Sequence, residues 1–215
     1  MNIKLPVLIC CISFVYCFTE LKADVAYKPT SNANILPFRQ SLDQTSWENQ
    51  NFSISKLNQN IIFLGGTDTV EQDFNGYLET LLTLELSEYQ PKFLNFSWQA
   101  DTVYKQQRPR YFYSKNKFNE GIADQRKKFP ADIVFLRYGK MESFDGLPKL
   151  REFADAYRQM IQNIKTFTKR IVVMTPYPFE SSGPLSSTAA NRNQVLQNYV
   201  KIIHEIGLEE GALVI

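Results

Sequence analysis

The stretch IIFLGGTDT, residues 61–69, ends an apolar run with two glycines and places a hydroxyl residue, Thr67, directly after them. A hydroxyl on such a turn can act as the nucleophile of acyl transfer, and nearby backbone N–H groups can stabilise an oxyanion. The alternative is that Thr67 or Thr69 caps a helix with Glu71 in its first turn. The stretch lacks the third glycine of a dinucleotide-binding loop and the Gly-Lys-Ser/Thr of a P-loop. Spacing alone favours the cap.

A second polar group, Glu142 and Asp145, follows the apolar run ADIVFLRY and a glycine. These carboxylates either project into a binding crevice or lie on a solvated turn before a helix that begins near Leu147 and Pro148. The single histidine, His204, lies in the helix-like stretch YVKIIHEIG, and we predict a structural or solvated role for it. A serine-type triad needs a base that reaches the nucleophile. With no histidine cluster, we predict no metal site and no cofactor.

The elements that must position these residues alternate between strand-like and helix-like segments. Strands are predicted at 61–64, 92–97, 131–138, 170–176 and 212–215, and helices at 76–86, 147–168 and 193–206. Such alternation indicates right-handed βαβ units around a parallel sheet. We therefore predict a three-layer α/β/α sandwich with a flavodoxin-like sheet.

Ligands of such sheets bind beyond the carboxyl ends of the strands. In this chain the loops at those ends are residues 65–69, 97–101, 139–144 and 176–180. We expect these four loops to meet and to form the functional site.

The first 23 residues have the order of a secretory signal peptide: a positive start, an apolar run of 14 residues and a small final residue, Ala23. We predict cleavage there, with an uncleaved anchor as the alternative, and a secreted or periplasmic protein without a membrane span. All three cysteines, Cys10, Cys11 and Cys17, lie in this leader, so the mature chain has no disulfide. Residues 24–57 are predicted to be an irregular lead-in, and residues 58–215 one domain. The near-neutral net charge of +2 gives no indication of nucleic-acid binding.

Several motifs, taken in order, resemble the SGNH/GDSL hydrolase superfamily over residues from about 58 to 215. FLGGT stands at the Gly-Asp-Ser block, NFSWQADTV at the Asn-x-Gly-x-x-Gly block and YGKMES at the Gly-x-Asn-Asp block. Together with GYLETLLT and TPYPFE, these motifs are most similar to a divergent, planctomycete-like bacterial branch that has GGT or GGN in its first block.

The resemblance implies a role for each aligned residue. Thr67 takes the position of the nucleophilic serine, and the backbone N–H groups of Thr67, Ser97 and Ala100 would form the oxyanion site. Met141 replaces the asparagine of the third block, and Glu142 replaces its aspartate. The sequence given stops at ALVI, before the place of the family's Asp-x-x-His block, which indicates a truncated domain.

The resemblance therefore implies an exported ester (acyl) hydrolase for a small-molecule or carbohydrate ester, with degenerate catalytic blocks. We expect little or no activity from the sequence as given, because the base and the third-block asparagine are missing. The alternative is an inactive module of this fold that binds carbohydrate through aromatic residues. Trp98, Tyr138, Phe144 and Tyr177 suit that function, unless they serve ordinary core packing.

Overall fold

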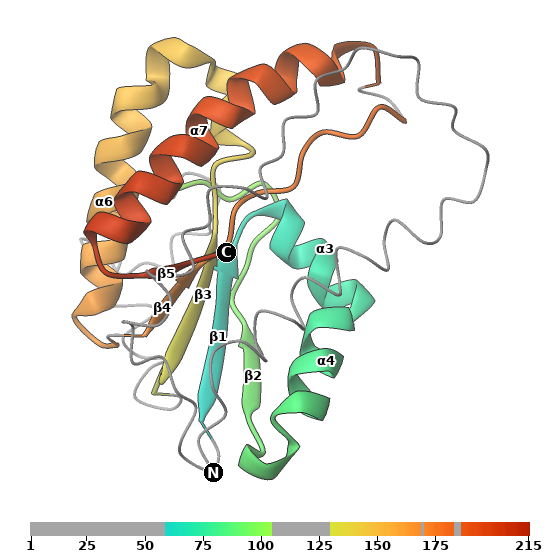
Figure 1. Cartoon of the computed structure of the whole chain (residues 1–215), viewed down its shortest axis with the longest axis vertical. Coiled ribbons are helices and arrows are strands. Elements are labelled where there is room, and N and C mark those ends of the chain that lie inside the picture. Colours follow the sequence, from blue (N-terminus) through green and yellow to red (C-terminus); the bar gives the residue numbers. More distant parts are fainter. Residues whose placement is uncertain (1–58, 105–129, 169, 183–185) are drawn as a thin grey trace.

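The computed structural model describes residues 59–104, 130–168, 170–182 and 186–215, which form a sheet with helices on both faces (Figure 1). Its strands are β1 (Asn60–Gly65), β2 (Lys92–Asn95), β3 (Ile133–Arg137), β4 (Ile171–Val173) and β5 (Leu213–Val214). Its helices are α3 (Thr67–Asn75), α4 (Tyr77–Glu85), α6 (Leu150–Lys165) and α7 (Ala189–Glu209). One-turn helices are η2 (Ser87–Tyr89), η4 (Glu142–Asp145), η5 (Leu147–Lys149) and η6 (Ser186–Thr188).

All strand pairs are parallel, and the strand order is β2-β1-β3-β4-β5. The centre of the sheet is the pairing of β1 with β3, in which Ile61 lies opposite Ile133 and Gly65 opposite Arg137. The order reverses at β1, because the chain goes from β1 outward to β2 and then back across to β3. The carboxyl ends of β1 and β3 therefore border the switch point at which ligands of such sheets bind.

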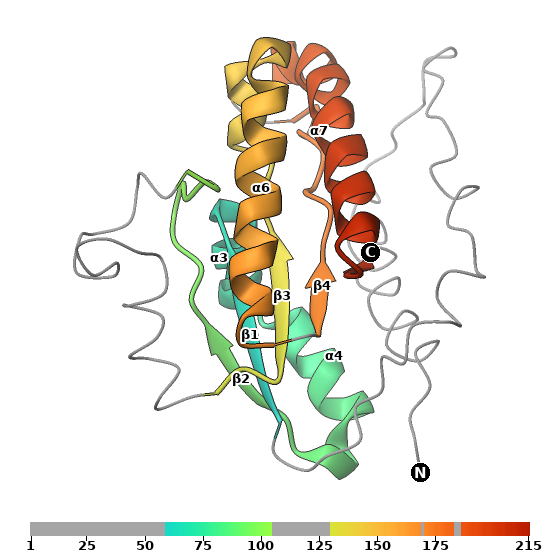
Figure 2. The same ribbon diagram turned by 90° about the vertical axis from the view of Figure 1, so that its left-hand side faces the viewer.

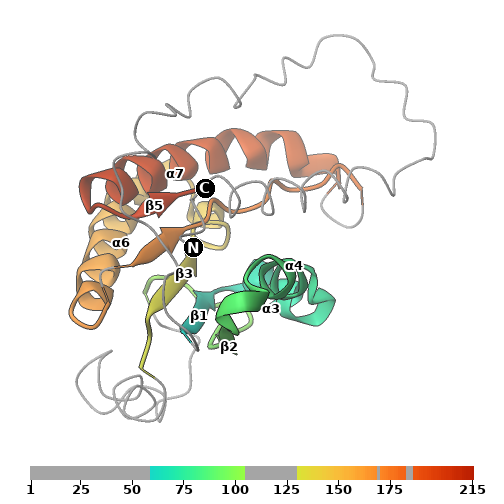
Figure 3. The same cartoon turned by 60° about the horizontal axis from the view of Figure 1, so that its bottom comes forward.

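Alternate side chains of the strands pack into two hydrophobic cores, one on each face of the sheet. Ile62 and Leu64 belong to the core under α6 and α7, whereas Ile61 and Phe63 belong to the core under α4. This alternation follows from the two-residue period of a strand, and a strand covered on both faces needs a continuous apolar run. Figure 3 shows the resulting three layers, and Figure 2 shows α6 and α7 side by side on one face.

The predicted fold class is confirmed: the domain is a three-layer α/β/α sandwich with a flavodoxin-like parallel sheet. The predicted strands and helices all occur, but α7 begins four residues before the predicted start at 193 and ends three after 206. A break at Gly76, whose φ is +63°, separates α3 from α4. The predicted leader with its three cysteines, and the predicted lead-in, lie outside the described residues. Among the described residues, no helix has both the length and the apolar character needed to span a bilayer.

Candidate functional site

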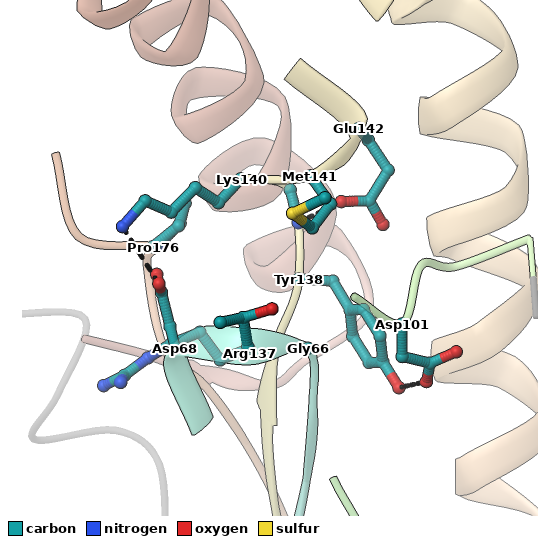
Figure 4. A pocket seen from close by; sticks show the side chains of 11 residues that line it. Gly66, Asp68, Asp101, Arg137, Tyr138, Lys140, Met141, Glu142 and Pro176 are labelled. Carbon is teal, nitrogen blue, oxygen red and sulfur yellow. Dashed lines mark hydrogen bonds and ion pairs between the residues drawn. The ribbon is translucent and has the colours of Figure 1, made fainter. Parts of the chain in front are cut away.

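A pocket, partly open to solvent, lies at the carboxyl ends of the central strands. Figure 4 shows the side chains around it. All four predicted loops contribute to its wall, together with Arg137, the last residue of β3, and Tyr138, which follows it. The lining residues are Gly66, Thr67, Asp68, Asp101, Arg137, Tyr138, Gly139, Lys140, Met141, Glu142 and Pro176.

Thr67 is the first residue of α3, directly after β1, and its side chain reaches the second loop. Its Oγ1 accepts a hydrogen bond from the backbone N–H of Ala100 over 3.0 Å. The interpretation of Thr67 or Thr69 as a helix cap is wrong, because Gly66 holds the N-cap position and no side chain caps the helix. Thr69 is instead fully buried. Thr67 is therefore free of a capping role and lies in the pocket wall.

Gly66 allows the first and second loops to approach each other closely. A Cβ atom at this position would lie 2.8 Å from the carbonyl oxygen of Asp101. That separation is shorter than carbon and oxygen tolerate without moving the backbone, so this arrangement has no room for a side chain at 66. The acidic residue that the SGNH pattern has here does not fit the present approach of the two loops.

The second loop places the two predicted oxyanion donors differently. Ala100 faces Thr67, and its backbone has a φ of +55°, the left-handed region that favours glycine. The N–H of Ser97 donates to Asn95 Oδ1 over 2.8 Å, and the Ser97 hydroxyl donates to the same oxygen. The structure thus brings Thr67 and Ala100 together, whereas Ser97 is engaged with Asn95 and does not line the pocket.

Glu142 connects the third loop, from inside the protein, to Val103, two residues beyond the second loop. Its carboxylate accepts the backbone N–H groups of Val103 and Gly139, each over 2.8 Å, and its side chain is only 1% exposed. Burial raises the pKa of Glu142 to about 7, although the two N–H groups favour the charged form. The solvated-turn alternative is therefore wrong for Glu142, while Asp145 is exposed. Met141, at the position of the family asparagine, lines the pocket and offers no hydrogen-bond donor there.

Two polar pairs in the pocket wall were not foreseen from the sequence. Lys140 Nζ lies 2.9 Å from Asp68 Oδ1, and the Tyr138 hydroxyl donates to Asp101 Oδ2 over 2.8 Å (Figure 4). Asp68 lies in the stretch IIFLGGTDT and Lys140 in YGKMES. They are 72 residues apart in the sequence, so only the packed sheet brings them together. The pocket thus contains three carboxyl groups, two cations and no histidine among its lining residues.

The aromatic residues proposed for sugar binding fall into two groups. Trp98 and Phe144 are exposed, at 38% and 43%. Tyr138 is buried, and the Tyr177 ring lies 4.3 Å from the Arg137 guanidinium carbon. His204 lies within α7 and is not one of the pocket-lining residues. Among the described residues, no three His, Cys, Asp or Glu side chains are grouped as a metal site would need.

Solved hydrolases share this fold. Axe2, an acetylxylan esterase from Geobacillus stearothermophilus, matches with a TM-score of 0.51 and 17% identity over 74% of this chain and 76% of its own. A protein described as a GDSL-like lipase, from Parabacteroides merdae, matches with a TM-score of 0.54 and 18% sequence identity. The match covers 74% of this chain and 77% of that protein. The acetyl xylan esterase AlAXEase matches with a TM-score of 0.53 and 16% sequence identity, over 72% of this chain and 75% of its own. Comparisons of the sequence with family models and with curated proteins give no match. The chain therefore has the SGNH/GDSL hydrolase fold.

Proposed function

We propose that this protein is an ester (acyl) hydrolase that acts, slowly, on acetylated carbohydrate. The observation that carries the proposal is Thr67, which starts α3 at the switch point of the sheet and is hydrogen-bonded to the Ala100 N–H. The fold supports it, because neighbours at this level of similarity include proteins named acetylxylan esterases. Export on the predicted leader is part of the same proposal, because it would bring the protein to polymeric carbohydrate outside the cell.

In the proposed reaction, Thr67 Oγ1 attacks the carbonyl carbon of the bound ester. The sugar alcohol leaves with the proton that the Thr67 hydroxyl gives up, and an acyl-threonine forms. Water then cleaves the acyl-threonine and releases the carboxylic acid. The Ala100 N–H, 3.0 Å from Oγ1, is near enough to donate to the oxyanion that develops on the attacked carbonyl.

Three features of the site predict slow turnover. Within the described residues, the one hydrogen bond of Thr67 Oγ1 is with a donor, the Ala100 N–H, so no base is placed to take its proton. The threonine methyl group restricts the side chain and crowds the attack. Met141 provides no oxyanion donor, and the loss of one such donor costs about 3 kcal/mol in comparable sites.

The test is hydrolysis of p-nitrophenyl acetate and of acetylated xylan by the purified protein. We expect slow turnover that Thr67→Ala abolishes and Thr67→Ser increases. Thr80→Ala is the matched control, because Thr80 is exposed on α4 and bonds only its own helix, through the Gly76 carbonyl. Turnover that survives Thr67→Ala would contradict the assignment of the nucleophile.

A binding module without catalysis is the second candidate function. The observation in its favour is that the exposed Trp98 and Phe144 lie on two of the loops that form the site. Binding of acetylated xylo-oligosaccharide without any release of acetate, from Thr67→Ser as well, would favour the binding module.

A further inference from the structure

Two aromatic rings and two cations lie against one another beside the pocket; we refer to Lys140, Phe144, Phe179 and Arg192 as the rim cluster. The rings of Phe144 and Phe179 meet edge to face, with centroids 5.2 Å apart. The Arg192 guanidinium carbon lies 4.4 Å from the Phe144 centroid, and Lys140 Nζ lies 5.3 Å from that of Phe179. Lys140 also lines the pocket, so the rim cluster and the pocket are continuous.

The rim cluster is held in place by hydrogen bonds from α7 and its preceding turn. The Asn193 side chain accepts the Phe179 N–H over 2.7 Å and donates to the Phe179 carbonyl over 2.9 Å. Arg192 Nε donates to Thr188 Oγ1 over 3.0 Å. A platform fixed in this way loses little conformational entropy when a ligand binds to it.

The charge of Arg192 is not balanced by any described carboxylate. Lys140 is paired with Asp68, whereas Arg192 makes no ion pair within the described residues. Glu180, the sequence neighbour of Phe179, accepts a hydrogen bond from Ser182. The two terminal nitrogens of Arg192 make no hydrogen bond to described residues, so no described acceptor satisfies this edge of its guanidinium.

We propose that the rim cluster is a subsite for a carboxylate-bearing sugar, a uronic acid, next to the ester in the pocket. Arg192 binds the carboxylate with two parallel N–H groups, the geometry that a guanidinium and a carboxylate share. The exposed part of the Phe144 ring packs against the apolar C–H face of the sugar. This inference rests on the proposed function and narrows its substrates to esters of acidic glycans.

The test compares the binding of trigalacturonate and of neutral xylotriose by calorimetry at pH 7 and low salt. We expect trigalacturonate to bind at least 10-fold more tightly, and this preference to weaken as salt is added. Arg192→Gln should remove most of the preference. Arg192→Lys, which keeps the positive charge but lacks the two parallel N–H groups, should retain part of it. Arg158→Gln is the matched control, because Arg158 lies on α6 and is paired with Glu209.

Equal affinities for the two oligosaccharides, or a preference that Arg192→Gln and Arg192→Lys both leave intact, would overturn the subsite. Circular dichroism of both variants shows whether the fold persists. The result is separable from the proposed catalysis. Tight binding of trigalacturonate without ester hydrolysis supports the subsite and contradicts the hydrolase. Ester hydrolysis without a preference for trigalacturonate over xylotriose supports the hydrolase and contradicts the subsite.

Discussion

Replacing Glu142 by glutamine should change how the stability of the domain depends on pH. Glu142 is buried, and its pKa is raised from 4.5 to about 7. The folded protein therefore holds a proton on this group over a pH range in which the unfolded chain has lost it. Stability from this group is fully present below about pH 4.5 and is lost as the pH rises through about 7.

The size of the effect follows from the shift in pKa. A rise from 4.5 to about 7 corresponds to about 3 kcal/mol, at roughly 1.4 kcal/mol per pH unit. About 2 kcal/mol of this is lost between roughly pH 5.5 and pH 8. Glu142→Gln stays neutral throughout, so its free energy of unfolding should fall by about 2 kcal/mol less than that of the wild type over this range.

The assay is urea unfolding followed by circular dichroism at the two pH values, with free energies from linear extrapolation. Glu152→Gln is the matched control, because Glu152 is 57% exposed on α6 and should leave the wild-type pH dependence unchanged. If Glu142→Gln alters stability equally at both pH values, Glu142 is ionised at both. The N–H groups of Val103 and Gly139 would then outweigh the cost of burial.

Further substitutions test the core, two backbone positions with positive φ, and the oxyanion site. Leu82→Ala should lower the free energy of unfolding by about 2–5 kcal/mol because Leu82 is fully buried, whereas Leu84→Ala, at a 66% exposed position of the same helix, should change it little in the same urea assay. Ala100→Gly and Gln90→Gly should each stabilise the fold by about 1 kcal/mol, because both residues have positive φ; an unchanged urea midpoint would show that these backbones are not strained. Met141→Asn should raise ester hydrolysis at least about 10-fold by restoring a donor, and an unchanged kcat would place residue 141 outside the oxyanion site.

The sheet and the position of the site could be predicted because both depend on local patterns. Continuous apolar runs such as Ile61–Leu64 indicate strands covered on both faces, and the strand–helix alternation fixes a parallel sheet. In such a sheet the loops at the carboxyl ends of the strands meet. The sequence therefore predicts, without knowledge of any contact, that Thr67 and Met141 lie in the same site.

What could not be predicted depends on contacts between distant segments. The carboxylate of Glu142 turns inward to backbone N–H groups, one of which is 39 residues away, at Val103. The pairing of Lys140 with Asp68, and the packing of Arg192 on Phe144, likewise need the exact positions of separate loops. Sequence spacing identifies which loops meet but not which side chains point at one another.

Covalent trapping of the acyl intermediate tests the proposed nucleophile most directly. p-Nitrophenolate can leave without a proton, whereas water needs a base to cleave the acyl-threonine. Because no described base contacts Thr67, the acyl-threonine should be hydrolysed more slowly than it forms and should accumulate during incubation with p-nitrophenyl acetate. Mass spectrometry of peptides from the acid-quenched protein should then find an acetyl group on Thr67, and none on this peptide from Thr67→Ala. Steady release of p-nitrophenol with Thr67 unmodified, and at the same rate in Thr67→Ala, would contradict the proposal.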